Sequence, residues 1–268
     1  MTRLESARLL LIALCLTQAC DRNTLLARSH SQPSEAGADA GHEDGGIPTD
    51  GGFSISDAGV AMCGKLVCAC SNGKDDDKDG LTDGLDGECT GAFDNDEASF
   101  GTGRERNPNA RCLNCFFDDN PGAGNDGCRI AASCAVNGVA QGAPGSCNTC
   151  EPTLECTDRC LSRTPNGCDC FGCCGVHLDD GSVVNVMLSA ECMIKGSKLS
   201  GCQSCVQNES CLNRCGTCEL CPGKTESELP AECRNQGGVT CEGGPVCSTN
   251  TPCDLGQYCG LGCCLDVL

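Results

Sequence analysis

The chain has 268 residues, 32 cysteines and a formal net charge of −19. Cysteine exceeds a tenth of all residues, which is above the roughly 8–10% that marks a disulfide scaffold in exported proteins. The negative charge argues against nucleic acid and anionic membrane surfaces as partners, because both attract lysine and arginine. With no tryptophan and one tyrosine, the chain has little apolar surface to bury, so we expect disulfides to supply much of its stability.

Residues 1–19 predict a signal peptide, with a basic start, an apolar run at 9–16 and small residues before Cys20. The apolar run is too short to span a bilayer, which takes about 20 apolar residues. Residues 17–20 resemble the lipobox of bacterial lipoproteins, in which the cysteine carries the lipid. We therefore predict lipidation at Cys20; ordinary cleavage after Ala19, leaving a free thiol, is the alternative.

Cysteine parity supports this assignment. If Cys15 leaves with the signal peptide and Cys20 carries lipid, thirty cysteines remain, from Cys63 to Cys264. Because thirty is an even number, they can form fifteen disulfides in an oxidising compartment. Between the anchor and these cysteines, residues 20–62 are rich in Ser, Gly, Ala and Asp, which predicts a lipidated N-terminus followed by a disordered tether.

Residues 63–103 form an acidic region that contains the clearest motif. Asp75, Asp77, Asp79, Asp83 and Asp86 occupy positions 1, 3, 5, 9 and 12 of a D-x-D-x-D-G-x2-D-x2-D pattern. Alternate carboxylates can converge on one hard cation, and the glycine at position 6 permits the sharp turn. We therefore predict that these five aspartates bind Ca²⁺. A solvated acidic turn is the alternative.

The flanks of this pattern contain glycine rather than helix formers, and position 12 lacks the glutamate of an EF-hand. The loop instead resembles thrombospondin type 3 repeats, in which calcium loops are tied by disulfides without EF-hand helices. Asp94, Asp96 and Glu97 are candidates for further ligands of the same ion or of a second one.

Residues 104–233 are cysteine-rich and contain an internal repeat. The spacing C-x2-C-x5-C-x3-C occurs at residues 147–160 and again, 55 residues later, at 202–215. Pro152 could open a helix in the first copy, and residues 209–221 have helical character in the second. Cysteines four residues apart share a helical face. We predict two short, cysteine-faced helices that are stapled to each other or to adjoining loops.

The remaining elements are expected to be few and short. Residues 182–188 contain three valines and predict one short strand rather than a larger sheet. Residues 234–268 form a short cysteine-rich tail, and Gly, Pro and Asn recur too often for long elements. The predicted fold class is small and disulfide-rich, mostly loops with a few short helices and a minor strand component, preceded by the disordered tether.

Two functional alternatives remain open. Pairs such as Cys112 and Cys115 have the C-x2-C spacing of zinc sites, so a secreted protein that binds zinc or copper through thiolates is one alternative, although export favours disulfides. His177 is the only histidine after the tether, and the sequence has no glycine-framed serine nucleophile and no phosphate-binding loop. We therefore predict no catalytic residues and no enzyme; an envelope enzyme with an unrecognised site is the second alternative.

The order of these features resembles a family of cysteine-rich bacterial envelope lipoproteins. The resemblance rests on the acidic loop, on Cys89 with residues 94–97, on the run 165–174 and on the closing cysteines 253–264. It implies an exported, lipid-anchored protein on the outer membrane, in the periplasm or on the surface, and it implies no established activity. We expect a non-catalytic, calcium-binding, disulfide-stapled lipoprotein with a structural or interaction role and an unknown protein or surface ligand as partner.

Overall fold

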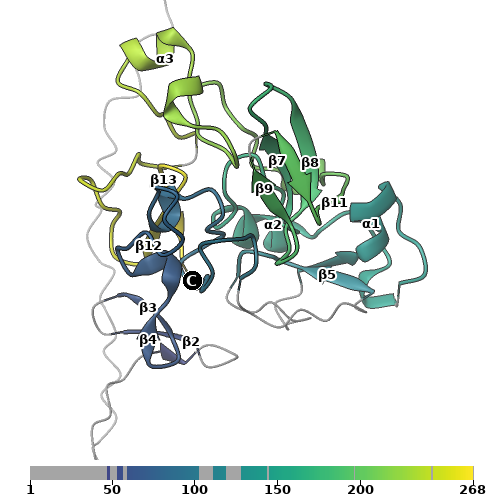
Figure 1. Ribbon diagram of the computed structural model, residues 1–268. Helices are drawn as coiled ribbons and strands as arrows, with labels where there is room; N and C mark the ends of the chain where they lie inside the picture. Colours follow the sequence, from purple (N-terminus) through teal and green to yellow (C-terminus); the bar gives the residue numbers. More distant parts are fainter. Residues whose placement is uncertain are drawn as a thin grey trace, which may run out of the picture. The chain divides into compact units, whose positions relative to one another are not determined.

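The computed structural model describes residues 47–48, 53–56, 59–102, 111–118, 128–143, 145–195, 197–242 and 244–267 (Figure 1). The expected signal peptide, Cys20 and most of the expected tether lie outside these residues. Over the part that is described, no helix is both long enough and apolar enough to cross a membrane.

The fold is small, disulfide-rich and dominated by loops, as predicted. In the described ranges the helices are α1 (Ala132–Asn137), α2 (Leu154–Leu161) and α3 (Ala231–Asn235), with short 3-10 turns η1 (Ala69–Ser71), η2 (Asp83–Leu85), η3 (Gly145–Cys147), η4 (Glu209–Cys211) and η5 (Glu226–Glu228). The strands are β1 (Ile47–Pro48), β2 (Phe53–Ile55), β3 (Ala61–Cys63), β4 (Leu66–Val67), β5 (Cys112–Asn114), β6 (Arg129–Ala131), β7 (Cys173–His177), β8 (Val183–Met187), β9 (Met193–Lys195), β10 (Lys198–Ser200), β11 (Gln203–Ser204), β12 (Gln257–Gly260) and β13 (Cys263–Asp266).

The first sheet corrects the end of the predicted tether. Strand β2 lies within residues 20–62, and it pairs antiparallel with β3, with Phe53 opposite Cys63. Ala61 is only 4% exposed. Sheet order β1-β2-β3-β4 therefore extends the folded part to the N-terminal side of Cys63.

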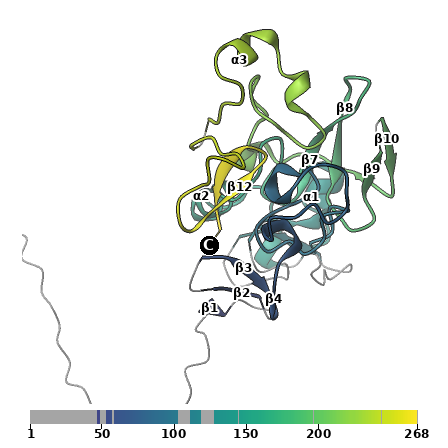
Figure 2. The ribbon, with the colours of Figure 1, turned by 60° about the vertical axis from the view of Figure 1, so that its left-hand side comes forward.

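The predicted strand at residues 182–188 is confirmed as β8, but it is not alone. It is the central strand of a three-stranded antiparallel sheet of order β11-β8-β7. Hairpin β9–β10 packs against this sheet through Ile194 and Leu199 (Figure 2). The sheet was missed because β7 carries two adjacent cysteines and a glycine instead of the β-branched residues that indicate strands.

All thirty cysteines from Cys63 to Cys264 are paired, which confirms the expected fifteen disulfides. The pairs are 63–68, 70–89, 112–147, 115–160, 128–156, 134–150, 168–174, 170–211, 173–205, 192–202, 215–221, 218–233, 241–263, 247–259 and 253–264. The two repeats are not stapled to each other. The first bonds back to residues 112–134, whereas the second bonds mainly to residues 170–192.

The bridges fall into sets that share no disulfide, and we group them into four modules, of which the central one contains two such sets, at 112–160 and at 168–211. We call them the acidic module (63–89), the central module (112–211), the small module (215–233) and the tail module (241–264). Apart from the backbone that connects them in sequence, the modules are therefore held against one another, in the described residues, by packing and hydrogen bonds rather than by disulfides. Cysteines also fill the core of the central module, where Cys115, Cys128, Cys156 and Cys160 surround the fully buried Phe171.

Only the first repeat contains an α-helix. Cys156 and Cys160 are both buried on one face of α2, as predicted, but the helix is capped by Thr153 rather than opened by Pro152. In the second repeat the helix prediction is wrong, since η4 ends at Cys211. Beyond it, Leu212 forms an antiparallel bridge with Asp169, and this pairing keeps the backbone extended.

Candidate metal site

The acidic loop is closed by the Cys70–Cys89 disulfide. Between these cysteines the chain turns several times, and two groups of carboxylates result. One group contains Asp75, Asp77 and Asp79; the other contains Asp79, Asp86 and Glu88. Within each group, one oxygen from every residue lies within 4.8 Å of the others. Asp79 belongs to both groups.

Backbone hydrogen bonds hold the first group in place. The Asp75 carboxylate accepts hydrogen bonds from the N–H groups of Lys78 (2.6 Å) and Gly80 (3.1 Å). The latter residue has φ of 102°, a conformation that glycine adopts without strain. The chain therefore turns sharply there, and Asp77 and Asp79 face the same space as Asp75. These three aspartates lie together as the sequence pattern predicts.

The second group contains the most unusual carboxylate of the loop. Asp86 is 0% exposed. Its Oδ1 accepts a hydrogen bond from the N–H of Glu88 at 2.9 Å, but its Oδ2 is buried without a hydrogen-bond partner. Burial and the neighbouring Glu88 carboxyl raise the pKa of Asp86, and burial with repulsion from Asp79 and Asp77 raises that of Glu88. A cation placed among these oxygens would satisfy the unpaired one and remove the repulsion.

Glu88 was not among the predicted ligands. It lies two residues past the end of the Asp pattern and directly before Cys89. The fold brings it to the site because Cys89 is bonded back to Cys70 at the start of the loop. An acidic residue beside the closing cysteine is the sequence signal that would have indicated it.

Asp83 is outside both carboxylate groups. Both of its oxygens accept the N–H of Gly73, at 3.1 and 3.0 Å, and its own N–H donates to Glu97 at 2.7 Å. Glu97 accepts a second hydrogen bond from the N–H of Asp76. In this arrangement Asp83 and Glu97 tie the loop backbone together instead of facing the cation space.

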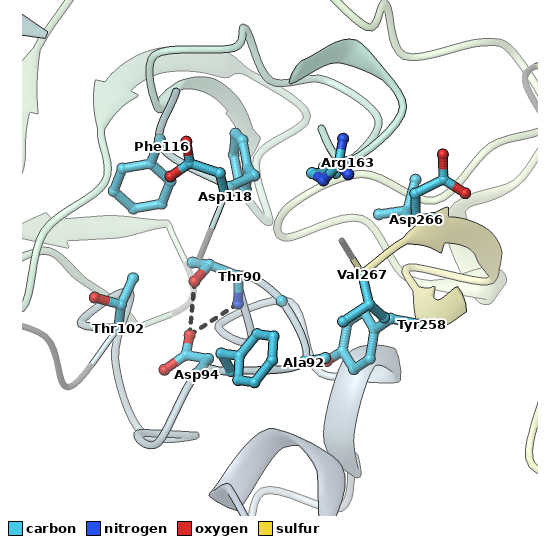
Figure 3. Close-up of a pocket in the computed structure, with 14 residues that line it drawn as sticks. Thr90, Ala92, Asp94, Thr102, Phe116, Asp118, Arg163, Tyr258, Asp266 and Val267 are labelled. Atoms are coloured by element: carbon cyan, nitrogen blue, oxygen red, sulfur yellow. Dashed lines mark hydrogen bonds between the residues drawn. The ribbon is translucent and has the colours of Figure 1, made fainter. Parts of the chain in front are cut away.

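Asp94 also supports the backbone. It is 2% exposed and accepts hydrogen bonds from the N–H and hydroxyl of Thr90, at 2.9 and 2.8 Å (Figure 3). A third bond comes from the N–H of Asp96. Burial outweighs these bonds and raises the pKa of Asp94 to about 7. The adjacent cavity, lined also by Phe116, Arg163 and Tyr258, measures about 30 Å³, which is room for one or two waters.

Two groups that contain cysteine have metal-like spacing but no free thiolate. His177 lies near Cys215 and Cys221, and Cys247 lies near Cys253 and Cys259. Each of these cysteines is in a disulfide, so its sulfur is not a thiolate ligand. Among the residues that the structure describes, the acidic loop is therefore the stronger candidate for a metal site.

Comparison with known proteins adds no relative: no family model, curated protein or solved structure matches the chain. Disulfide bonding on this scale is typical of extracellular and envelope proteins, which fold where thiols oxidise. The pairing of every cysteine from Cys63 onward is thus the main structural indication of the compartment.

Proposed function

We propose that this chain is a non-catalytic, calcium-binding lipoprotein of the cell envelope with a structural or interaction role. The observation that carries the calcium part is the buried Oδ2 of Asp86, which has no hydrogen-bond partner, in a carboxylate that groups with those of Asp79 and Glu88. Leaving a carboxylate oxygen unpaired in the interior is costly. A cation bound to this oxygen would replace the missing hydrogen bond with a stabilising electrostatic contact.

The proposed ligands are Asp75, Asp77, Asp79, Asp86 and Glu88. All are carboxylates, which favour hard cations over zinc or copper. Ca²⁺ accepts roughly 6–8 oxygens in flexible geometry, whereas Mg²⁺ requires a near-ideal octahedron and keeps several waters. A loop that offers this many carboxylates therefore suits Ca²⁺ better. Backbone carbonyls and water would complete the coordination.

The anchor proposal combines Cys20 with the tether. Lipid at Cys20 would hold the protein on a membrane, and as a random coil the roughly 26 residues between Cys20 and β1 would reach about 28 Å. The disulfide-bonded part would then face a protein or surface ligand that is not an anionic polymer, given the net charge of −19. Labelling with a fatty-acid analogue tests this proposal, and Cys20→Ala should abolish both the label and membrane association.

The calcium proposal is tested by titrating Ca²⁺ into chelator-treated protein in a calorimeter and by measuring thermal unfolding with and without Ca²⁺. We expect saturable Ca²⁺ binding, a rise in the unfolding temperature and weaker effects from Mg²⁺, because ligands that bind only the folded state stabilise it. Absence of both binding and stabilisation at millimolar Ca²⁺ would refute the calcium part and leave the disulfide architecture unaffected.

A further inference from the structure

The tail module packs directly on the turn that joins the proposed calcium ligands. Gly84 lies in η2, between Asp79 and Asp86. Its carbonyl accepts a hydrogen bond from the N–H of Leu261 at 2.6 Å. A Cβ atom at Gly84 would lie 1.8 Å from the carbonyl oxygen of Cys259 and 2.6 Å from the Tyr258 hydroxyl. Strand β12 and the calcium loop therefore meet with no space for a side chain at this position.

Tyr258 extends the same contact into the acidic module. Its ring packs against a cluster that contains Ala61, Ala92 and Phe93. Figure 3 shows the side chain reaching from the tail hairpin toward Ala92 and the Asp94 region. The hydroxyl is buried without a hydrogen-bond partner. Tyr258 is thus an apolar anchor whose position depends on the shape of the acidic loop.

No disulfide crosses this contact. The bridges of the tail module join only residues 241–264, and those of the acidic module only residues 63–89. The hairpin β12–β13 can therefore leave the loop without breaking a covalent bond. Its attachment there rests on the Gly84 hydrogen bond and on the packing of Tyr258, with Val267 beside it in the same cluster.

We propose that cation binding in the acidic loop controls whether the tail hairpin β12–β13 docks on that loop. The inference rests on the calcium proposal and extends it. Without a cation, the carboxylates between Asp75 and Glu88 repel one another, and the buried Asp86 carboxylate is hydrated only if the loop opens to solvent. Since Gly84 is only two residues from Asp86, the loop cannot open there without displacing the turn that holds Tyr258 and Leu261. A bound cation keeps the turn closed and the hairpin docked.

Hydrogen exchange on the oxidised full-length protein tests this proposal. With Ca²⁺, we expect exchange in the segment that contains Tyr258 and Leu261 to slow by about tenfold or more, while strands β7 and β8 are unchanged. The sole tyrosine, in a chain without tryptophan, gives a second readout. Its fluorescence should change with the same midpoint as calorimetric Ca²⁺ binding. Ca²⁺ binding without either change would overturn the proposal and leave the calcium site intact; no binding at all would instead remove the calcium site and with it the proposal.

Substitutions then separate docking from binding. Gly84→Ala should leave the hairpin exchanging rapidly even with Ca²⁺, whereas Gly91→Ala, whose Cβ would meet nothing within 4 Å, should behave as wild type. If Gly84→Ala does not fold, Tyr258→Ala gives the same test without changing the loop. Because coupling is reciprocal, Tyr258→Ala should also weaken Ca²⁺ binding by about tenfold. A hairpin that stays protected in both variants would contradict the proposed contact.

Discussion

Asp79 is the residue where the two carboxylate groups meet. It approaches Asp75 and Asp77 on one side and Asp86 and Glu88 on the other. We predict that Asp79→Asn weakens Ca²⁺ binding by more than about tenfold, or about 1.4 kcal/mol, as measured by calorimetry. Asp158→Asn makes the same charge change on the exposed face of α2 and should retain wild-type affinity. Equal affinities for the two variants would show that Asp79 is not a ligand.

Glu88 and Asp83 give a direct comparison between the structure and the sequence pattern. Because Glu88 lies in a carboxylate group and Asp83 accepts the Gly73 N–H, we expect Glu88→Gln to weaken Ca²⁺ binding by about tenfold. Asp83→Asn should change it by less than about threefold, since an amide oxygen can still accept that bond. Calorimetry on both variants distinguishes them, and the reverse order would favour the original pattern.

The same two residues show what sequence could and could not reveal about the site. Asp75, Asp77 and Asp79 are brought together by a local turn, so their spacing alone predicts the group. Glu88 reaches it through the pairing of Cys70 with Cys89, and connectivity cannot be deduced from sequence. Asp83 fits the pattern, but a competing hydrogen bond from Gly73 occupies its carboxylate.

Buried acids determine the pH dependence of the cation-free protein. Burial raises the pKa of Asp94 to about 7 and that of Asp169 to about 6, from usual values of 3.8. The folded state therefore prefers their protonated forms, and this stabilisation is complete below about pH 4 and is lost as pH rises through 6 and 7. With chelator present, the unfolding temperature should fall from about pH 4.5 to about pH 8. A rise over this range would contradict these shifts.

At the scale of elements, helix α2 begins at a side-chain cap that contributes to its stability. The Thr153 hydroxyl accepts the N–H of Cys156 at 3.2 Å. Thr153→Ala should lower the free energy of unfolding by about 1 kcal/mol, measured by denaturant unfolding of the oxidised protein. Thr157→Ala, inside the same helix, should be neutral or slightly stabilising, because alanine has the higher helix propensity. A larger loss from Thr157→Ala would argue against the cap.

Local signals explain why one helix of the repeat was predicted correctly and the other was not. In α2 the cysteine spacing, the cap and the absence of glycine agree. Residues 209–221 have a similar local pattern, but the N–H of Asn213 donates to Cys168 and that of Cys170 donates to Cys211. These partners are about 40 residues away in sequence, beyond what periodicity can indicate.

At the scale of the whole molecule, four modules without shared disulfides predict a simple cleavage pattern. Trypsin acting after Arg234 on denatured, unreduced protein should release residues 235–268 as a separate peptide with three internal bridges. Its mass should rise by about six hydrogens on reduction, two per bridge. A cut after Arg159 should leave its fragments joined through Cys115–Cys160, whereas a cut after Arg163, which no bridge spans, should separate the two halves of the central module. If residues 235–268 instead stay joined to the rest of the chain after this cut, a disulfide must link the tail module to another module, and the connectivity described here is wrong. Sequence supplied the number of bridges, whereas their partners depend on the tertiary fold.

The backward pairing of the first repeat has a consequence for how the protein matures. Cys112, Cys115, Cys128 and Cys134 enter the oxidising compartment before any of their partners, which begin at Cys147. An oxidase that joins cysteines as they emerge would link these four to one another. We therefore expect correct maturation to require repeated thiol–disulfide exchange, which proceeds through mixed disulfides over seconds to hours. Yield of the native protein should accordingly be limited by disulfide isomerase rather than by the rate of secretion.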